Sequence, residues 1–166
     1  MTGVKLGETF LLVGCDDPLL LAGLGSKVGL SGLAAAVVLD EDEAVRARRA
    51  AAREGFLLEL AIARDGTVPF DDGQFDMAIV DDTLGRFAAR APELRTALLR
   101  HARRALRLGG RIEVIEGLGS SGPFARATGR PPGYDAVREL ETAGYRPVRV
   151  LAELPNFRFV EGLGLA

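Results

Sequence analysis

The sequence has few of the residues that stabilise small proteins through disulfides or metal coordination. Cys15 is the single cysteine and His101 the single histidine. One cysteine excludes an internal disulfide, and one cysteine with one histidine argues against a structural zinc site. No apolar run approaches the roughly 18 residues that span a bilayer, and residues 1–10 lack the apolar core of a secretory signal. We therefore expect a cytoplasmic protein with no metal and no membrane segment.

The chain also lacks an excess of charge of either sign. Its 21 basic and 23 acidic residues leave a formal net charge of −2 at pH 7. This charge gives no electrostatic indication of binding to nucleic acid or to an anionic membrane. Arginines are interleaved with acids and small residues along the predicted helices, which indicates solvated helix faces. With 166 residues, 48% of them hydrophobic, the chain is predicted to form a single domain (1–166) with its own core.

What the sequence does contain is a regular alternation of apolar runs and helical patterns. The first strand is predicted at Thr9–Val13, and the first helix starts at Pro18 with Asp17 as its N-cap. Gly55 is expected to end the second helix in a left-handed conformation. Further strands are predicted at residues 34–39, 57–62, 75–80, 111–116, 145–154 and 157–163, and further helices at residues 40–54, 92–107 and 134–143.

The end of the chain decides the topology. Helices between strands imply parallel pairing, because a crossover connection needs room. The last two strands are separated only by Pro155 and Asn156, which forces an antiparallel hairpin. The sequence therefore predicts an α/β, Rossmann-like, doubly wound sheet of seven strands, mostly parallel, with a C-terminal antiparallel hairpin. The exposed hairpin edge also predicts a homodimer, and residues 117–133, which show no periodicity, are expected to form a flexible loop.

Three local stretches carry a family resemblance. They are "VPFDDGQFDMAIV" at residues 68–80, "LLRHARRALRLGGRIEVIE" at residues 98–116, and "LETAGYRPVRV" before the hairpin. In this order, and with Leu108 in place of a usual proline, they resemble the class I S-adenosylmethionine-dependent methyltransferases, most of all the small-molecule branch that includes the ubiquinone-biosynthesis type. The resemblance implies the predicted fold, S-adenosylmethionine as cofactor, and methyl transfer to a small-molecule substrate.

The first cofactor motif that the resemblance implies is only partly present. The family has an acid, one further residue, and then "G-x-G-x-G"; the corresponding residues here are Leu12, Gly14, Asp16 and Pro18, with Cys15 after the first glycine. A side chain at the second glycine occupies space where ligand and backbone meet. Carboxylates there disfavour a pyrophosphate dinucleotide, whereas S-adenosylmethionine, with no phosphate and a cationic sulfonium, tolerates them better. Asp16 and Asp17 are either ligand contacts or a turn residue and a helix cap.

The other cofactor positions leave similar alternatives. The acid that holds the ribose hydroxyls corresponds to Leu39, with Asp40 one step further on, so Asp40 is either a ribose ligand or an acid in the first turn of a helix. The adenine-contacting acid corresponds to Arg64, with Asp65 adjacent, and this pair either brackets an adenine or forms an exposed turn. Cys15 either lines the cofactor turn or is a small buried residue.

Acids also follow the predicted fourth and fifth strands. Asp81, with Asp82 beside it, either orients a ligand or acts as a general base, or it is a solvated loop acid; Glu116 is a similar case. His101 has no partner motif and is expected to be structural or exposed. No catalytic constellation can be assembled, and no N-terminal substrate lid is expected.

Two functions therefore stay open. One is S-adenosylmethionine-dependent methyl transfer to a small molecule, which would need residues 117–133 or a second subunit to exclude water from the substrate. The other is a catalytically inactive protein that keeps the fold for assembly or regulation.

Overall fold

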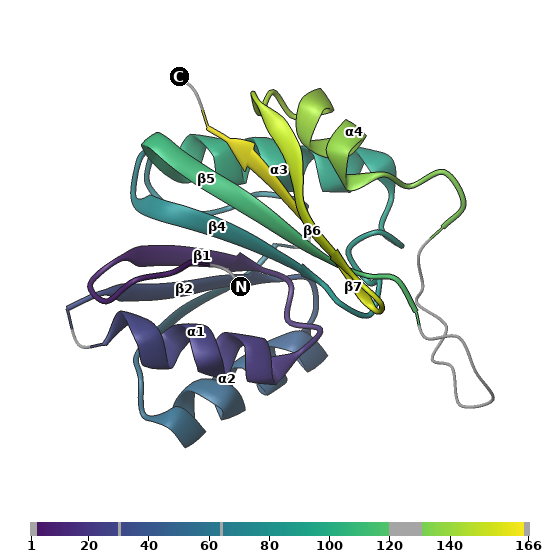
Figure 1. Ribbon diagram of the computed structural model, residues 1–166. Coiled ribbons are helices and arrows are strands. Elements are labelled where there is room, and N and C mark those ends of the chain that lie inside the picture. The colour runs from purple at the N-terminus through teal and green to yellow at the C-terminus, as the bar shows by residue number, and fades with distance from the viewer. Residues whose placement is uncertain (1–2, 30, 64, 120–130, 165–166) are drawn as a thin grey trace.

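The computed structural model describes residues 3–29, 31–63, 65–119 and 131–164 (Figure 1). One seven-stranded sheet runs through these residues, with the strand order β3-β2-β1-β4-β5-β7-β6. The elements in chain order are β1 (Thr9–Val13), α1 (Pro18–Val28), β2 (Leu33–Val38), α2 (Glu41–Glu54), β3 (Leu58–Ile62), β4 (Phe75–Asp82), α3 (Pro92–Ala105), β5 (Leu106–Gly117), α4 (Ala136–Thr142), β6 (Val148–Leu154) and β7 (Phe157–Leu163).

The strand pairing confirms the predicted fold class. Strands β1 to β5 pair in parallel, whereas β7 pairs antiparallel with both β5 and β6. The antiparallel part is the hairpin that Pro155 and Asn156 connect, and it lies at one edge of the sheet (Figure 1). The fold is therefore a doubly wound α/β sheet with a reversed C-terminal strand.

Helices cover both faces of the sheet (Figure 1). α1 and α2 pack on one face, and α3 and α4 pack on the other, so β1 is enclosed from both sides. Its residues alternate accordingly: Phe10 and Leu12 belong to the core under α1 and α2, and Leu11 and Val13 belong to the core under α3. A strand buried on both faces has no need of polar residues, which explains the unbroken apolar run.

Local capping chemistry sets the predicted helix starts. Asp17 accepts a hydrogen bond from the Leu19 amide at 2.9 Å, and Asp40 accepts one from the Glu43 amide at 2.9 Å. Gly55 follows α2 at φ 75°, the left-handed conformation expected of it. These caps confirm the start of α1 and the end of α2, whereas α2 starts one residue later than predicted.

Other predicted boundaries were wrong. α3 ends at Ala105, and the segment expected to finish it already belongs to β5. Leu106 pairs with Phe75, and regular pairing with β4 resumes only at Arg111, so the "LGGR" stretch forms an irregularity within the strand. β4 also continues to Asp82, two residues beyond its predicted end.

The C-terminal region shows smaller differences. α4 begins at Ala136 because Asp135 caps it, and β6 begins at Val148, after Pro147. Most of the loop predicted at residues 117–133 lies outside the described residues. No helix among the described residues has both the length and the apolar composition needed to cross a bilayer.

Candidate functional site

The candidate site lies where the carboxyl ends of β1, β2, β4 and β5 meet, the edge at which open α/β sheets hold ligands. Here the β1–α1 turn lies against the end of β4. Gly14 adopts φ 81°, and a Cβ added to it would stand 3.1 Å from the Asp81 carbonyl oxygen. Its amide donates to the Val37 carbonyl at 2.8 Å. Gly14 is therefore required both by its left-handed backbone and by the close approach of β4.

Asp16 turns its carboxylate towards the segment that follows β4. Its Oδ2 accepts hydrogen bonds from the amides of Leu84 at 2.9 Å and Arg86 at 3.4 Å, and its Oδ1 lies 3.6 Å from Nε of Arg86. The side chain is only 1% exposed. Burial raises the pKa of Asp16, while the two amides and the Arg86 guanidinium act in the opposite direction. At the place of the family's second glycine there is thus a buried, bonded carboxylate.

Asp81 makes the converse contact from β4 to the β1–α1 turn. Its Oδ2 accepts the Asp17 amide at 2.7 Å, and its Oδ1 accepts the Thr83 hydroxyl at 2.8 Å. Burial raises the pKa of Asp81 to about 6, against the opposing effect of these bonds. Asp16 and Asp81, which we call the carboxylate clamp, therefore tie the two loops together in opposite directions. The reading of Asp81 as a solvated acid was wrong, because the residue is 1% exposed.

Asp40 is engaged in two interactions at the end of β2. Besides capping α2, it forms an ion pair with Arg90, whose Nη2 lies 3.1 Å from Oδ2. The pKa of Asp40 is lowered, chiefly by the hydrogen bond from the Glu43 amide and also by Arg90. The Glu43 carboxylate in turn accepts a hydrogen bond from the amide of Leu39, the residue before the cap, at 2.9 Å. The main role of Asp40 in the structure is therefore to cap α2.

The remaining cofactor positions are dispersed. Leu12 is fully buried in the core under α1 and α2, so no acid is available there. Asp65 is exposed and closes a turn by accepting the Thr67 amide at 3.0 Å, which lowers its pKa. Arg64 lies outside the described residues. The structure therefore does not bring Asp65 into the group formed by Asp16, Asp40 and Asp81.

Cys15 is a buried structural residue. Its side chain is 0% exposed, and burial, with Asp81 nearby, raises its thiol pKa to about 12. The thiol is therefore protonated and unreactive at neutral pH. Its carbonyl oxygen accepts Nε of Arg46 at 3.2 Å, which ties the β1–α1 turn to α2.

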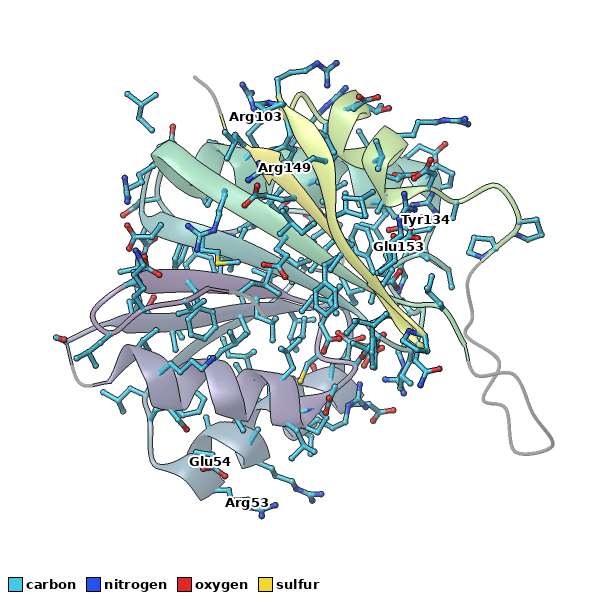
Figure 2. The ribbon with its side chains drawn as sticks, in the orientation of Figure 1. Arg53, Glu54, Arg103, Tyr134, Arg149 and Glu153 are labelled. Carbon is cyan, nitrogen blue, oxygen red and sulfur yellow. The ribbon has the colours of Figure 1, made fainter. Side chains whose placement is uncertain are left out.

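Asp82 and Glu116 form a second group of buried acids. They are register partners at the ends of β4 and β5, and burial, with Asp16 and Glu116 nearby, raises the pKa of Asp82 to about 7. Asp82 accepts the Ala88 amide at 3.0 Å, and Glu116 lies 3.5 Å from the Arg158 guanidinium. Tyr134 lies on the segment leading into α4 (Figure 2), and the guanidinium carbon of Arg95 lies over its ring, 5.2 Å from the centroid.

Sequence reasoning missed the arginines of this site. Arg86 and Arg90 follow β4, and Arg46 comes from α2; they pair with groups 31 to 70 residues away in the chain. The sequence holds many arginines in similar surroundings, so none of these three carried a distinguishing signal. Only the packing of the loops against one another selects them.

The residues of this edge do not fit S-adenosylmethionine seated as a "G-x-G-x-G" turn seats it. The second glycine position holds the bonded Asp16 carboxylate, the strand-one acid position holds apolar Leu12, and Asp40 is engaged by Arg90 and by its helix. Within the described residues, no group of three or more His, Cys, Asp or Glu side chains could hold a metal ion.

Comparisons with known proteins bear on the fold and the family. No family profile matches the sequence. The chain is 30% identical over 116 residues to the mitochondrial 2-methoxy-6-polyprenyl-1,4-benzoquinol methylase of Leishmania donovani. The match covers 68% of this chain but 35% of the methylase, so the chain spans about a third of that relative's length.

Solved structures extend the likeness to almost the whole chain. A SAM-dependent methyltransferase from Aquifex aeolicus superposes with a TM-score of 0.77 at 22% identity, covering 99% of this chain and 86% of its own. PigF, solved with SAH, superposes with a TM-score of 0.64 at 18% identity, covering 94% of this chain and 50% of its own. The chain therefore has the fold of the class I S-adenosylmethionine-dependent methyltransferases.

Proposed function

We propose that this chain is a catalytically inactive methyltransferase-like protein, whose cofactor edge is held shut by its own side chains and whose role is in assembly or regulation. The observation that carries the proposal is the Asp16 carboxylate, buried and bonded to the amides of Leu84 and Arg86. An adenosyl ligand seated as in a "G-x-G-x-G" turn would have to displace the Asp16 carboxylate and break these bonds. Breaking bonds to buried charged groups costs more than breaking exposed ones.

Isothermal titration calorimetry with SAH tests the proposal directly. SAH is named with the solved neighbour PigF, and S-adenosylmethionine is the cofactor that the methyltransferase neighbours support. We expect no binding heat at millimolar ligand, and a thermal-shift series should agree. A saturable heat with a dissociation constant in the micromolar range would reject the closed site, and with it the inactive function.

A second candidate function is methyl transfer from S-adenosylmethionine to a small molecule. It is favoured by the 30% identity to a benzoquinol methylase and by Asp82, whose pKa of about 7 suits a group that accepts a proton near neutral pH. Incubation with labelled S-adenosylmethionine and a benzoquinol acceptor tests it, and loss of turnover in Asp82→Asn would assign the base. No label transfer with either protein is the result expected of the inactive function.

The homodimer stays a prediction. β6 is the edge strand of the sheet, with Val150, Leu151 and Leu154 exposed. It also carries a register shift between Val150 and Ala152, and Arg149 and Glu153 stand exposed on it (Figure 2). Both features oppose pairing between edge strands, so a dimer would have to use the apolar side chains rather than the free backbone groups. Sedimentation velocity would decide the oligomeric state.

A further inference from the structure

The turn that follows β4 presents several donors to a single carboxylate. Gly85 adopts φ 75°, and its amide donates to the Asp82 carbonyl at 3.1 Å, so the turn is tightly closed. The amides of Leu84 and Arg86 point to the same oxygen of Asp16, and the Arg86 guanidinium lies 3.6 Å from the other oxygen. Backbone amides in a turn with a left-handed residue form concave anion sites, and arginine strengthens them.

The carboxylate in this turn comes from a different loop. Asp16 precedes α1, 68 residues before Leu84 in the chain. Its neighbour Asp17 caps α1 and faces the solvent more. The helix start therefore does not require Asp16, because Asp17 already provides the cap. What Asp16 adds is a negative group seated on the donors of residues 84–86.

Only one of the two carboxylate oxygens of Asp16 is hydrogen-bonded in this turn. Among the described residues, no hydrogen bond reaches its Oδ1, although this atom is buried. The Arg86 side chain, by contrast, is 42% exposed and free to adjust. A carboxylate attached to the β1–α1 turn can use only part of the donor set, whereas an unattached carboxylate could orient both oxygens.

We infer that the turn at residues 84–86 is a binding site for a small carboxylate, which Asp16 occupies as an internal ligand. The inference rests on the proposed function, since it explains how the cofactor edge is kept shut. The ligand class follows from the donors: two amides and one guanidinium suit a planar monocarboxylate. Removal of the Asp16 side chain leaves the donors in place and vacates the space that the carboxylate filled.

Chemical rescue tests the inference. Asp16→Ala should unfold at a lower temperature than the wild type, and sodium formate at tens of millimolar should raise its midpoint by a few degrees relative to sodium chloride at equal ionic strength. Asp17→Ala is the matched control, because it removes the neighbouring carboxylate and leaves the site filled. The wild type and Asp17→Ala should gain no more from formate than from chloride.

Equal formate responses in all three proteins, or no response in Asp16→Ala, would overturn the inference. Asp16→Ser, whose hydroxyl can accept one amide, serves the same test if Asp16→Ala does not fold. Asp16→Asn keeps the volume filled and should not be rescued. The two proposals fail separately: SAH binding to the wild type rejects the closed cofactor edge, while the formate response of Asp16→Ala reports on the turn alone.

Discussion

Strand β4 carries an aspartate near its start and two aspartates at its end, and the two ends behave in opposite ways. Near its start, Asp76 accepts the Thr9 amide at 2.8 Å and the Thr9 hydroxyl at 2.9 Å and pairs with Arg107. Burial opposes the charged form of Asp76, but these bonds outweigh it and its pKa is lowered. At the other end, burial dominates, and the pKa values of Asp81 and Asp82 rise to about 6 and about 7.

The pKa difference distinguishes a carboxylate whose charge stabilises the folded chain from carboxylates whose charge destabilises it. Asp76 is partly hydrated and fully paired, so its charge stabilises the folded chain. Asp81 and Asp82 lie at the edge where ligands bind in open α/β sheets, and their charges are held at the expense of stability. Residues kept in an unfavourable state are expected at functional positions, which agrees with a candidate site at this end of β4.

The largest expected effect of this contrast is on the pH dependence of stability. Burial raises the folded-state pKa values of Asp81 and Asp82 to about 6 and about 7, and it raises that of Glu113, a buried residue of β5, to about 7. Between pH 4 and 7 the folded chain therefore binds more protons than the unfolded chain, and the free energy of unfolding falls as the pH rises. We expect a loss on the order of 6 kcal/mol between pH 5 and pH 8. Urea unfolding at several pH values measures it, and a stability that is flat or rises over this range would contradict the contrast.

The same substitution at the two ends of β4 should have opposite effects. Asp82→Asn keeps an oxygen for the Ala88 amide and removes an unfavourable charge, so it should stabilise the chain by about 1–2 kcal/mol at pH 8 and by much less at pH 5. Asp76→Asn weakens the bonds from Thr9 and the pair with Arg107, so it should destabilise by about 1–2 kcal/mol at both pH values. If urea unfolding at pH 8 showed that both substitutions change the free energy of unfolding in the same direction, the comparison would be refuted.

The smallest effect is expected at Asp40, which combines a cap with a partly exposed ion pair. Asp40→Ala should cost about 1 kcal/mol because α2 loses its cap. Arg90→Ala should cost about 0.5 kcal/mol or less, because the pair is partly exposed and screened by solvent. Thermal unfolding of both variants distinguishes the two roles. A larger loss in Arg90→Ala than in Asp40→Ala would mean that the ion pair, rather than the cap, is the main task of Asp40.

The sequence by itself determined the features that depend on neighbours in the chain. A two-residue connection leaves no room for a crossover, so the hairpin was predictable from Pro155 and Asn156. The Asp17 cap acts over two residues, so the start of α1 was predictable for the same reason. Asp40 was expected inside the first turn of α2, and the structure places it one residue earlier, as the cap. The irregular start of β5 was not predictable, because it depends on the register with Phe75 across the sheet.

The contacts within the candidate site were decided by the tertiary structure alone. The carboxylate clamp joins residues 64 to 70 positions apart, and the pairing of Asp40 with Arg90 spans 50 positions. Sequence showed that Asp16 stood where a glycine was expected, but its burial and its partners depend on where the turn after β4 comes to lie. Hydrogen bonds and desolvation act over a few ångströms, so groups that are distant in the chain acquire these properties only once the loops are packed together.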